Sequence, residues 1–152
     1  MKRHPALVPL SHDHHDGLLL AVKLQQGPRA LLRLWSHDPF WQAEYVVRFF
    51  EEHLISHFVA EEQFLFPAAS RHLKEHMALI ERLLAEHKEM RALREFFRHP
   101  EEKKLECNLT HFGKLLEDHI HAEERELFPL CERLIPEAEW RALNEQLNTK
   151  KA

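Results

Sequence analysis

Two histidine and glutamate pairs offer metal ligands, because each pair has helical spacing. His57 stands four residues before Glu61, and His119 stands four residues before Glu123. Residues four apart on an α-helix lie on one face, about one turn from each other. Imidazole and carboxylate groups suit iron, manganese or zinc. The pairs therefore suggest two helices that aim ligands into one shared site.

Both pairs belong to an internal repeat. The segments HFVAEEQFLFP (57–67) and HIHAEERELFP (119–129) are identical at seven of eleven positions, at a constant offset of 62. A solvent-exposed helix face has no reason to reproduce this whole pattern, so the repeat favours ligand roles for the histidine and the first glutamate. We expect the Leu-Phe-Pro ends to be structural, closing one end of the molecule and stopping each helix.

A weaker match adds one histidine from each of two further segments. Asp13-His14 corresponds to Glu86-His87, and each dipeptide precedes an apolar helical stretch. Two carboxylates in such a set can bridge two cations that histidines cap from either side, leaving coordination positions for solvent, an oxo or hydroxo bridge, or a small molecule. The predicted ligands are His14, His57, Glu61, His87, His119 and Glu123.

Several neighbouring residues leave alternatives open. His15 is adjacent to His14, and the register with His87 favours His14. His53 lies one turn before His57 and is a candidate for a further ligand, although Leu115 at the matching repeat position favours a core or supporting role. Glu62 and Glu124 either point away from the ligands or accept a hydrogen bond from a histidine N–H; the sequence alone leaves this undecided.

Composition and apolar spacing predict an all-α fold. The chain has three glycines, many Leu, Glu, Lys, Arg and Ala residues, and almost no β-type alternation. We expect an antiparallel up-down four-helix bundle with a short C-terminal helix, in one domain spanning 1–152. The bundle covers about residues 11–130 and the short helix about 136–147.

Capping residues and prolines place the helices. Ser11 is the expected cap of a first helix that ends at Gly27-Pro28, and Ser70 the expected cap of a third helix that ends at His99-Pro100. The second helix begins at Pro39 and the fourth at Pro100. A broken apolar segment precedes Pro39, where Trp35, Phe40 and Trp41 fit either a cover over the bundle or a contact in a homodimer.

Size, charge and cysteine content argue against several classes of function. With 152 residues and a formal charge of −4, the chain has no basic patch that would predict a nucleic-acid or membrane partner. Its apolar runs are too short to span a bilayer. Cys107 and Cys131 lack metal-binding spacing, and the first residues lack a signal-peptide pattern. We therefore expect free thiols and a cytoplasmic protein.

These motifs resemble the hemerythrin-like, HHE cation-binding family. The resemblance is carried by DHHDGL (13–18), AEHKEM (85–90) and the two repeat copies. It implies a bundle around a non-haem di-iron centre, with two oxo- or hydroxo-bridged iron ions, zinc or manganese as substitutes, and Glu61 and Glu123 as the bridging ligands. A small diatomic or peroxide ligand is the implied partner.

The chain departs from oxygen-carrying members of that family in two places. Leu83 and Arg91 stand where a second histidine flanks His87, and the fourth helix has HxxxE in place of HxxxxD. The resemblance therefore points to the branch implicated in iron handling, in sensing of oxygen or nitric oxide, and in stress response. The alternatives are a di-metal oxidoreductase or peroxidase-like enzyme at the same centre, and a metal-free helical interaction domain.

Overall fold

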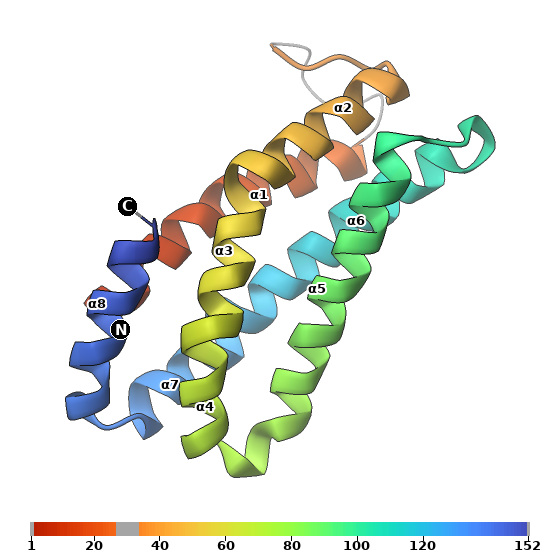
Figure 1. The fold of residues 1–152 in the computed structure, drawn as a ribbon. Helices are drawn as coiled ribbons and strands as arrows, with labels where there is room; N and C mark the ends of the chain where they lie inside the picture. Colours follow the sequence, from red (N-terminus) through yellow and green to blue (C-terminus); the bar gives the residue numbers. More distant parts are fainter. Residues whose placement is uncertain (1, 27–33, 152) are drawn as a thin grey trace.

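The computed structural model describes residues 2–26 and 34–151, which are almost entirely helical and include no strand. Four long helical segments form the predicted antiparallel bundle (Figure 1). The first segment is α1 (Val8–Gln26), preceded by the 3-10 turn η1 (Pro5–Leu7), and the third is α5 (Met77–Arg98), preceded by η5 (Lys74–His76). α8 (Glu137–Lys151) lies outside the four and packs on η1, α3 and η4.

The second and fourth segments are each built from several helical pieces. The second comprises α2 (Pro39–Phe49), η3 (Phe50–Leu54), α3 (Ile55–Ala60), η4 (Glu61–Leu65) and α4 (Phe66–His72). The fourth comprises α6 (Glu102–Ala122), η6 (Glu123–Leu127) and α7 (Phe128–Leu134). The pieces η3, η4 and η6 are π-helical turns, in which an N–H bonds the carbonyl five residues earlier. Both η4 and η6 begin at the glutamate of a His-x-x-x-Glu pair.

The prediction that Pro67 and Pro129 stop their helices is wrong. α4 continues to His72 and α7 continues to Leu134. An interior proline normally disrupts an α-helix because it lacks an N–H and its ring clashes with the carbonyl four residues earlier. Here the π turns shift the hydrogen-bond register first, and each proline then lies in the first turn of a new α-helical piece, where a missing N–H costs little.

Two predicted helix caps are also wrong. Ser11 lies inside α1, because the chain turns helical earlier, at η1, where the His4 ring accepts a hydrogen bond from the Ala6 N–H. Ser70 lies inside α4, because the helix runs on past Pro67. α8 begins where predicted but extends beyond residue 147 to Lys151.

Trp35, a few residues before α2, covers one end of the bundle. The predicted stop at Gly27-Pro28 and the residues from 29 to 33 lie outside the described part of the chain. Asp38 caps α2, since its carboxylate accepts a hydrogen bond from the Phe40 N–H at 3.1 Å. Trp35 is only 3% exposed and packs edge-on against Trp41 and Tyr45, so of the two predicted roles it has that of a cover.

The core consists of two apolar clusters with a polar layer between them. One cluster contains Leu65, Phe66, Leu127 and Phe128, so the Leu-Phe residues of both repeat copies do close one end of the bundle. The other cluster lies toward Trp35. Along every long segment, the buried histidine or glutamate falls between residues of the two clusters. The fold therefore encloses the predicted ligands in apolar surroundings.

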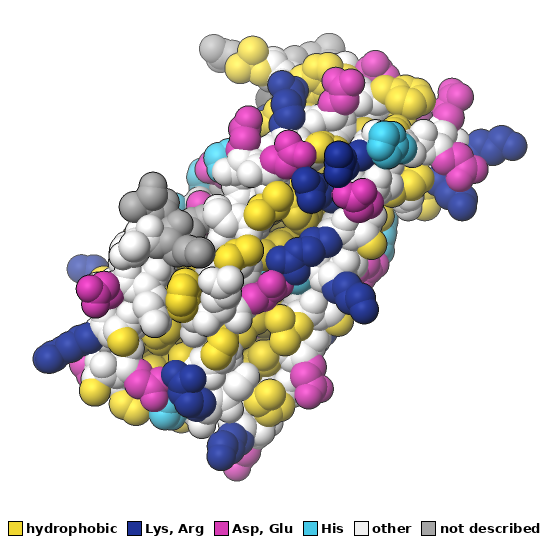
Figure 2. Space-filling model, in the orientation of Figure 1, with side chains coloured by type: hydrophobic (Ala, Val, Ile, Leu, Met, Phe, Trp, Pro, Cys, Tyr) yellow, Lys and Arg dark blue, Asp and Glu magenta, His cyan; other side chains and the backbone are white. Residues whose placement is uncertain are grey.

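The surface carries both positively and negatively charged side chains. On the face shown in Figure 2, basic and acidic side chains are interspersed with apolar ones along the whole length of the molecule. Among the described helices, none combines the length and the apolar character that crossing a membrane requires.

Candidate metal centre

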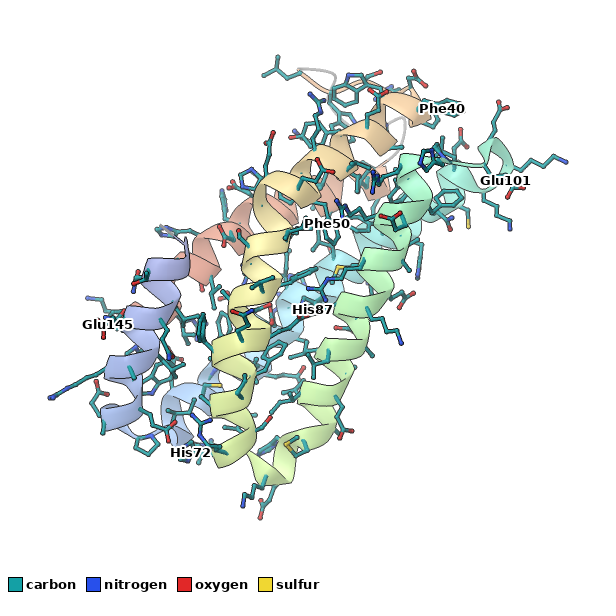
Figure 3. All side chains as sticks on the ribbon, in the orientation of Figure 1. Phe40, Phe50, His72, His87, Glu101 and Glu145 are labelled. Atoms are coloured by element: carbon teal, nitrogen blue, oxygen red, sulfur yellow. The ribbon has the colours of Figure 1, made fainter. Side chains whose placement is uncertain are left out.

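The structure brings all six predicted ligands into the interior. Glu61 and Glu123 are fully buried, and the four buried histidines of the described chain are those predicted as ligands. Figure 3 shows His87 pointing from α5 into the bundle. Each long segment contributes one histidine: His14 from α1, His57 from α3, His87 from α5 and His119 from α6.

These side chains form two groups that share both glutamates. The first group is His14, His57, Glu61 and Glu123; the second is Glu61, His87, His119 and Glu123. Within each group, one ligand atom of every member lies within 4.8 Å of the others. Each group offers two imidazoles and two carboxylates, a donor set that iron, manganese and zinc accept.

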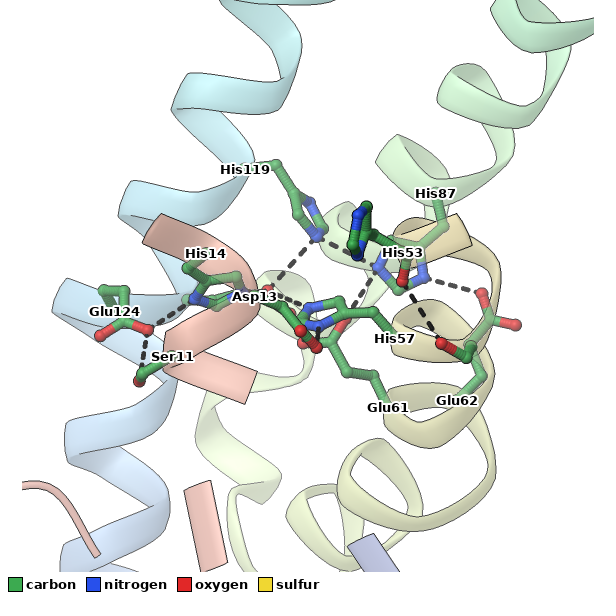
Figure 4. Close-up of polar contacts among 12 residues, drawn as sticks. Ser11, Asp13, His14, His53, His57, Glu61, Glu62, His87, His119 and Glu124 are labelled. Atoms are coloured by element: carbon green, nitrogen blue, oxygen red, sulfur yellow. Dashed lines mark hydrogen bonds and ion pairs between the residues drawn. The ribbon is translucent and has the colours of Figure 1, made fainter. Parts of the chain in front are cut away.

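Each of the four buried histidines is oriented by a carboxylate on its outer nitrogen. The Nδ1 atoms lie 2.5 Å from Glu124 for His14, 3.0 Å from Asp13 for His57 and 2.7 Å from Glu62 for His87 (Figure 4). The Nδ1 of His119 lies 2.8 Å from Glu86. An Nδ1–H donated to a carboxylate fixes the tautomer and leaves the Nε2 lone pair for a cation. All four Nε2 atoms face the shared glutamates.

The inner atoms of the cluster fit a cation. Both oxygens of Glu61 and the Oε2 of Glu123 are buried without a hydrogen-bond donor among the described residues. The Nε2 atoms of His87 and His119 lie 3.1 Å apart. With both Nδ1–H groups donated outward, lone pairs this close repel each other unless a proton or a cation lies between them. Buried anionic oxygens are also costly without a partner. The residues present therefore fit bound metal.

The pKa values also indicate that the cluster favours positive charge. Burial would lower the pKa of His87, but the neighbouring carboxylates of Glu61 and Glu62 outweigh burial and raise the pKa to about 9. Burial opposes charge on His57 as well, yet Glu61 and Asp13 raise its pKa well above the usual value. Burial would raise the pKa of Glu123, but the charge of His119 and nearby hydrogen bonds hold it well below its usual range. The cluster attracts positive charge strongly.

The structure places the remaining candidates outside the two groups. His15 is exposed, and His53 is half-buried against Phe49. Glu62 and Glu124 accept hydrogen bonds from histidines, one of the two roles that the sequence left open. Asp13 and Glu86 were missed in this role, although both stand in the weak Asp-His and Glu-His match that located His14 and His87. Cys107 and Cys131 are free thiols.

The fold and the site together define a helical-bundle protein that is built to bind metal between its helices. Residues 6–131 match the family described as Hemerythrin HHE cation binding domain, and the chain belongs to this family. The match spans both repeat copies and the histidines of α1 and α5, and excludes residues 2–5 and α8. Neither a search of curated proteins nor a search of solved structures found a match.

Proposed function

We propose that the chain binds two iron ions in this cluster, one at each group, with Glu61 and Glu123 shared between them. The proposal rests on the convergence of four Nε2 atoms on two carboxylates. Within the described part of the chain, three of the four oxygens of these carboxylates have no hydrogen-bond donor. Two cations that share two glutamates would give each buried oxygen a positive partner. Bound iron would supply open coordination positions and one-electron redox chemistry.

We further propose that the ligand is a small molecule such as dioxygen, nitric oxide or hydrogen peroxide. A small cavity adjoins the first group, lined by apolar side chains and by three of the histidines: Leu54, Phe58, Leu116, Ile120, His14, His57 and His119 with Asp13. Its volume is about 10 Å³, close to the minimum for one water molecule. This size favours a diatomic or peroxide ligand over a larger substrate.

The protein's own groups would act on such a ligand by position and by charge. Leu54, Phe58 and Ile120 give the cavity an apolar lining, which would strengthen electrostatic interactions with a bound ligand. Asp13 holds the His57 ring with its Nε2 directed inward. The chain thereby presents a largely apolar space for the ligand beside fixed imidazoles.

Iron analysis tests the proposal. Protein from iron-replete cells should contain two iron ions per chain, and Mössbauer spectra should show a coupled pair. The double variant Glu61→Gln/Glu123→Gln removes both buried charges with little change of shape, and should retain little iron. Glu89→Gln on the surface of α5 is the matched control. Iron-free wild-type protein, or unchanged iron content in the double variant, would overturn the proposal.

A further inference from the structure

His14 and His87 have matching surroundings. Glu62 accepts from the Nδ1 of His87, and the ring of Phe58 stacks on this imidazole with centroids 3.9 Å apart. Arg91 donates to Glu62 through both terminal nitrogens, at 2.7 and 3.0 Å, and lies 5.6 Å from the centre of the Phe58 ring. One arginine thus fixes both the carboxylate and the ring that orient His87.

The same arrangement occurs around His14 with different residues. The carboxylate of Glu124 accepts from the Nδ1 of His14, and Phe128 stacks on the His14 ring with centroids 5.5 Å apart. Arg3 lies 5.4 Å from the centre of the Phe128 ring, and its Nη2 is 3.3 Å from the carboxylate of Glu124. Ser11 donates a further hydrogen bond to Glu124 at 2.7 Å.

The two arginines come from different parts of the molecule. Arg91 lies on α5, one turn after His87. The register that matches His14 with His87 puts Leu18 at the corresponding place on α1, so α1 supplies no arginine there. Arg3 precedes η1 and reaches Glu124 from outside the four long segments.

Arg3 also satisfies a backbone group that the helix leaves unpaired. In the π-helical register, the carbonyl of Glu124 would accept a hydrogen bond from residue 129, but Pro129 has no N–H. Arg3 donates to this carbonyl at 3.1 Å through Nη2. The arginine therefore holds Glu124 at its backbone and at its carboxylate.

α7 and α8 hold the segment that carries Arg3. Glu132 of α7 accepts from Arg3 Nη1 at 2.7 Å and from the His4 backbone N–H at 2.6 Å. The His4 ring stacks on Trp140 of α8, with centroids 4.2 Å apart, and Trp140 is 1% exposed. Arg3, His4 and α8 all lie outside the residues that match the family.

We propose that Arg3 is a positioning residue for the cation held by the first group, and that this cation depends on the N-terminal segment and on α8. The cation of the second group is positioned by Arg91 from within the bundle. This inference rests on the proposed function. It adds that different parts of the chain retain the two cations.

Cobalt titration of chelator-stripped protein tests the inference, because Co(II) absorption reports each bound ion and elemental analysis counts them. In wild-type protein we expect two Co(II) per chain. Arg3→Ala should lower the affinity for one Co(II) about tenfold, which is the lower end of the usual effect for residues that support a metal ligand. The affinity for the other Co(II) should not change. Arg3→Lys should restore part of the loss. Arg98→Ala, on the exposed face of α5, is the control and should change neither.

Combining Arg3→Ala with a second substitution shows which cation Arg3 supports and through which residue. In a His14→Ala background only the second position remains, so Arg3→Ala should have no further effect on the bound cation while Arg91→Ala weakens it. In a Glu124→Gln background, Arg3→Ala should have a smaller effect than in the wild-type background, because only its contacts with the backbone carbonyl and with Phe128 remain to be lost. Equal weakening of both cations, no weakening of either, or an effect of Arg3→Ala after His14→Ala would overturn the inference. A wild-type chain that binds no cation would instead contradict the proposed function itself.

Discussion

Four carboxylates outside the ligand cluster decide how its imidazoles are oriented. They are Asp13, Glu62, Glu86 and Glu124, and each accepts from one Nδ1. Three of the four also pair with an arginine: Glu62 with Arg91, Glu86 with Arg82 and Glu124 with Arg3. By accepting the Nδ1–H, these carboxylates fix the tautomer of each imidazole and direct its Nε2 inward. We therefore expect changes at these positions to alter metal affinity without removing any ligand.

Asp13→Asn and Glu86→Gln should each weaken metal binding about 10- to 100-fold, because the amide no longer accepts from the imidazole as an anion. Titration of stripped protein with Co(II) measures the effect. Asp16→Asn is a matched control, since Asp16 is exposed on the same helix as Asp13. Wild-type affinity in both variants would show that these carboxylates do not support the ligands.

The stability of stripped protein should fall as the pH rises from about 6.5 to about 9. The pKa of His87 is raised from 6.5 to about 9, so the folded state binds this proton more tightly than the unfolded state does. Stabilisation is complete below pH 6.5 and is lost as the pH passes 9, with an upper bound of about 3 kcal/mol for this group.

Urea unfolding at a series of pH values measures this dependence. His57 and His14 also have raised pKa values and act in the same direction. His87→Gln should therefore reduce the slope without abolishing it. A free energy of unfolding that increases over this interval would contradict the prediction.

At the scale of elements, the π turns set where the ligands point. Two of the three π turns, η4 and η6, start at a bridging candidate, Glu61 or Glu123, and each of these two is followed by an α-helical piece with a proline in its first turn. Helical spacing predicted the His-x-x-x-Glu faces correctly, because the turns begin only at the glutamate. The same reasoning misplaced the helix ends at Pro67 and Pro129, since apolar periodicity does not reveal a change of hydrogen-bond register.

Close packing of α1 on α6 should be sensitive to added volume at Gly113. A Cβ at this position would lie 3.0 Å from the carbonyl oxygen of Ala21 and 3.0 Å from the Cβ of Leu24. Gly113→Val should therefore destabilise the protein by about 1–3 kcal/mol, which lowers Tm by roughly 2–4 °C per kcal/mol for a chain of this size. Thermal unfolding tests this, with Thr110→Val on the exposed side of α6 as the control. An unchanged Tm for Gly113→Val would show that the helices can separate at little cost.

At the scale of the whole molecule, the predicted ligands lie between two apolar clusters, each made of buried side chains. Removing metal should lower stability while leaving the helices in place, because both apolar clusters remain buried. Each cation present at 100 times its Kd stabilises the folded state by about 2.7 kcal/mol, so chelation of both should lower Tm by on the order of 10–20 °C.

Calorimetry and far-UV circular dichroism with and without a chelator test this expectation. The Glu61→Gln/Glu123→Gln variant should show the same Tm with and without the chelator. Loss of the helical signal on chelation of the wild-type protein would show that the metal is needed for folding itself.

The sequence alone determined the fold class, the six clustered residues and their division into a duplicated pair and two single histidines. Helical periodicity and an internal repeat are local properties, so they can be read from spacing. Tertiary structure decided which carboxylate holds which histidine, because Asp13 meets His57 and Glu86 meets His119 only when separate segments pack together. It also brought Arg3 to Glu124, which lies 121 residues away in the chain. No local pattern encodes such a contact, because it depends on where η1 and α8 dock on the finished bundle.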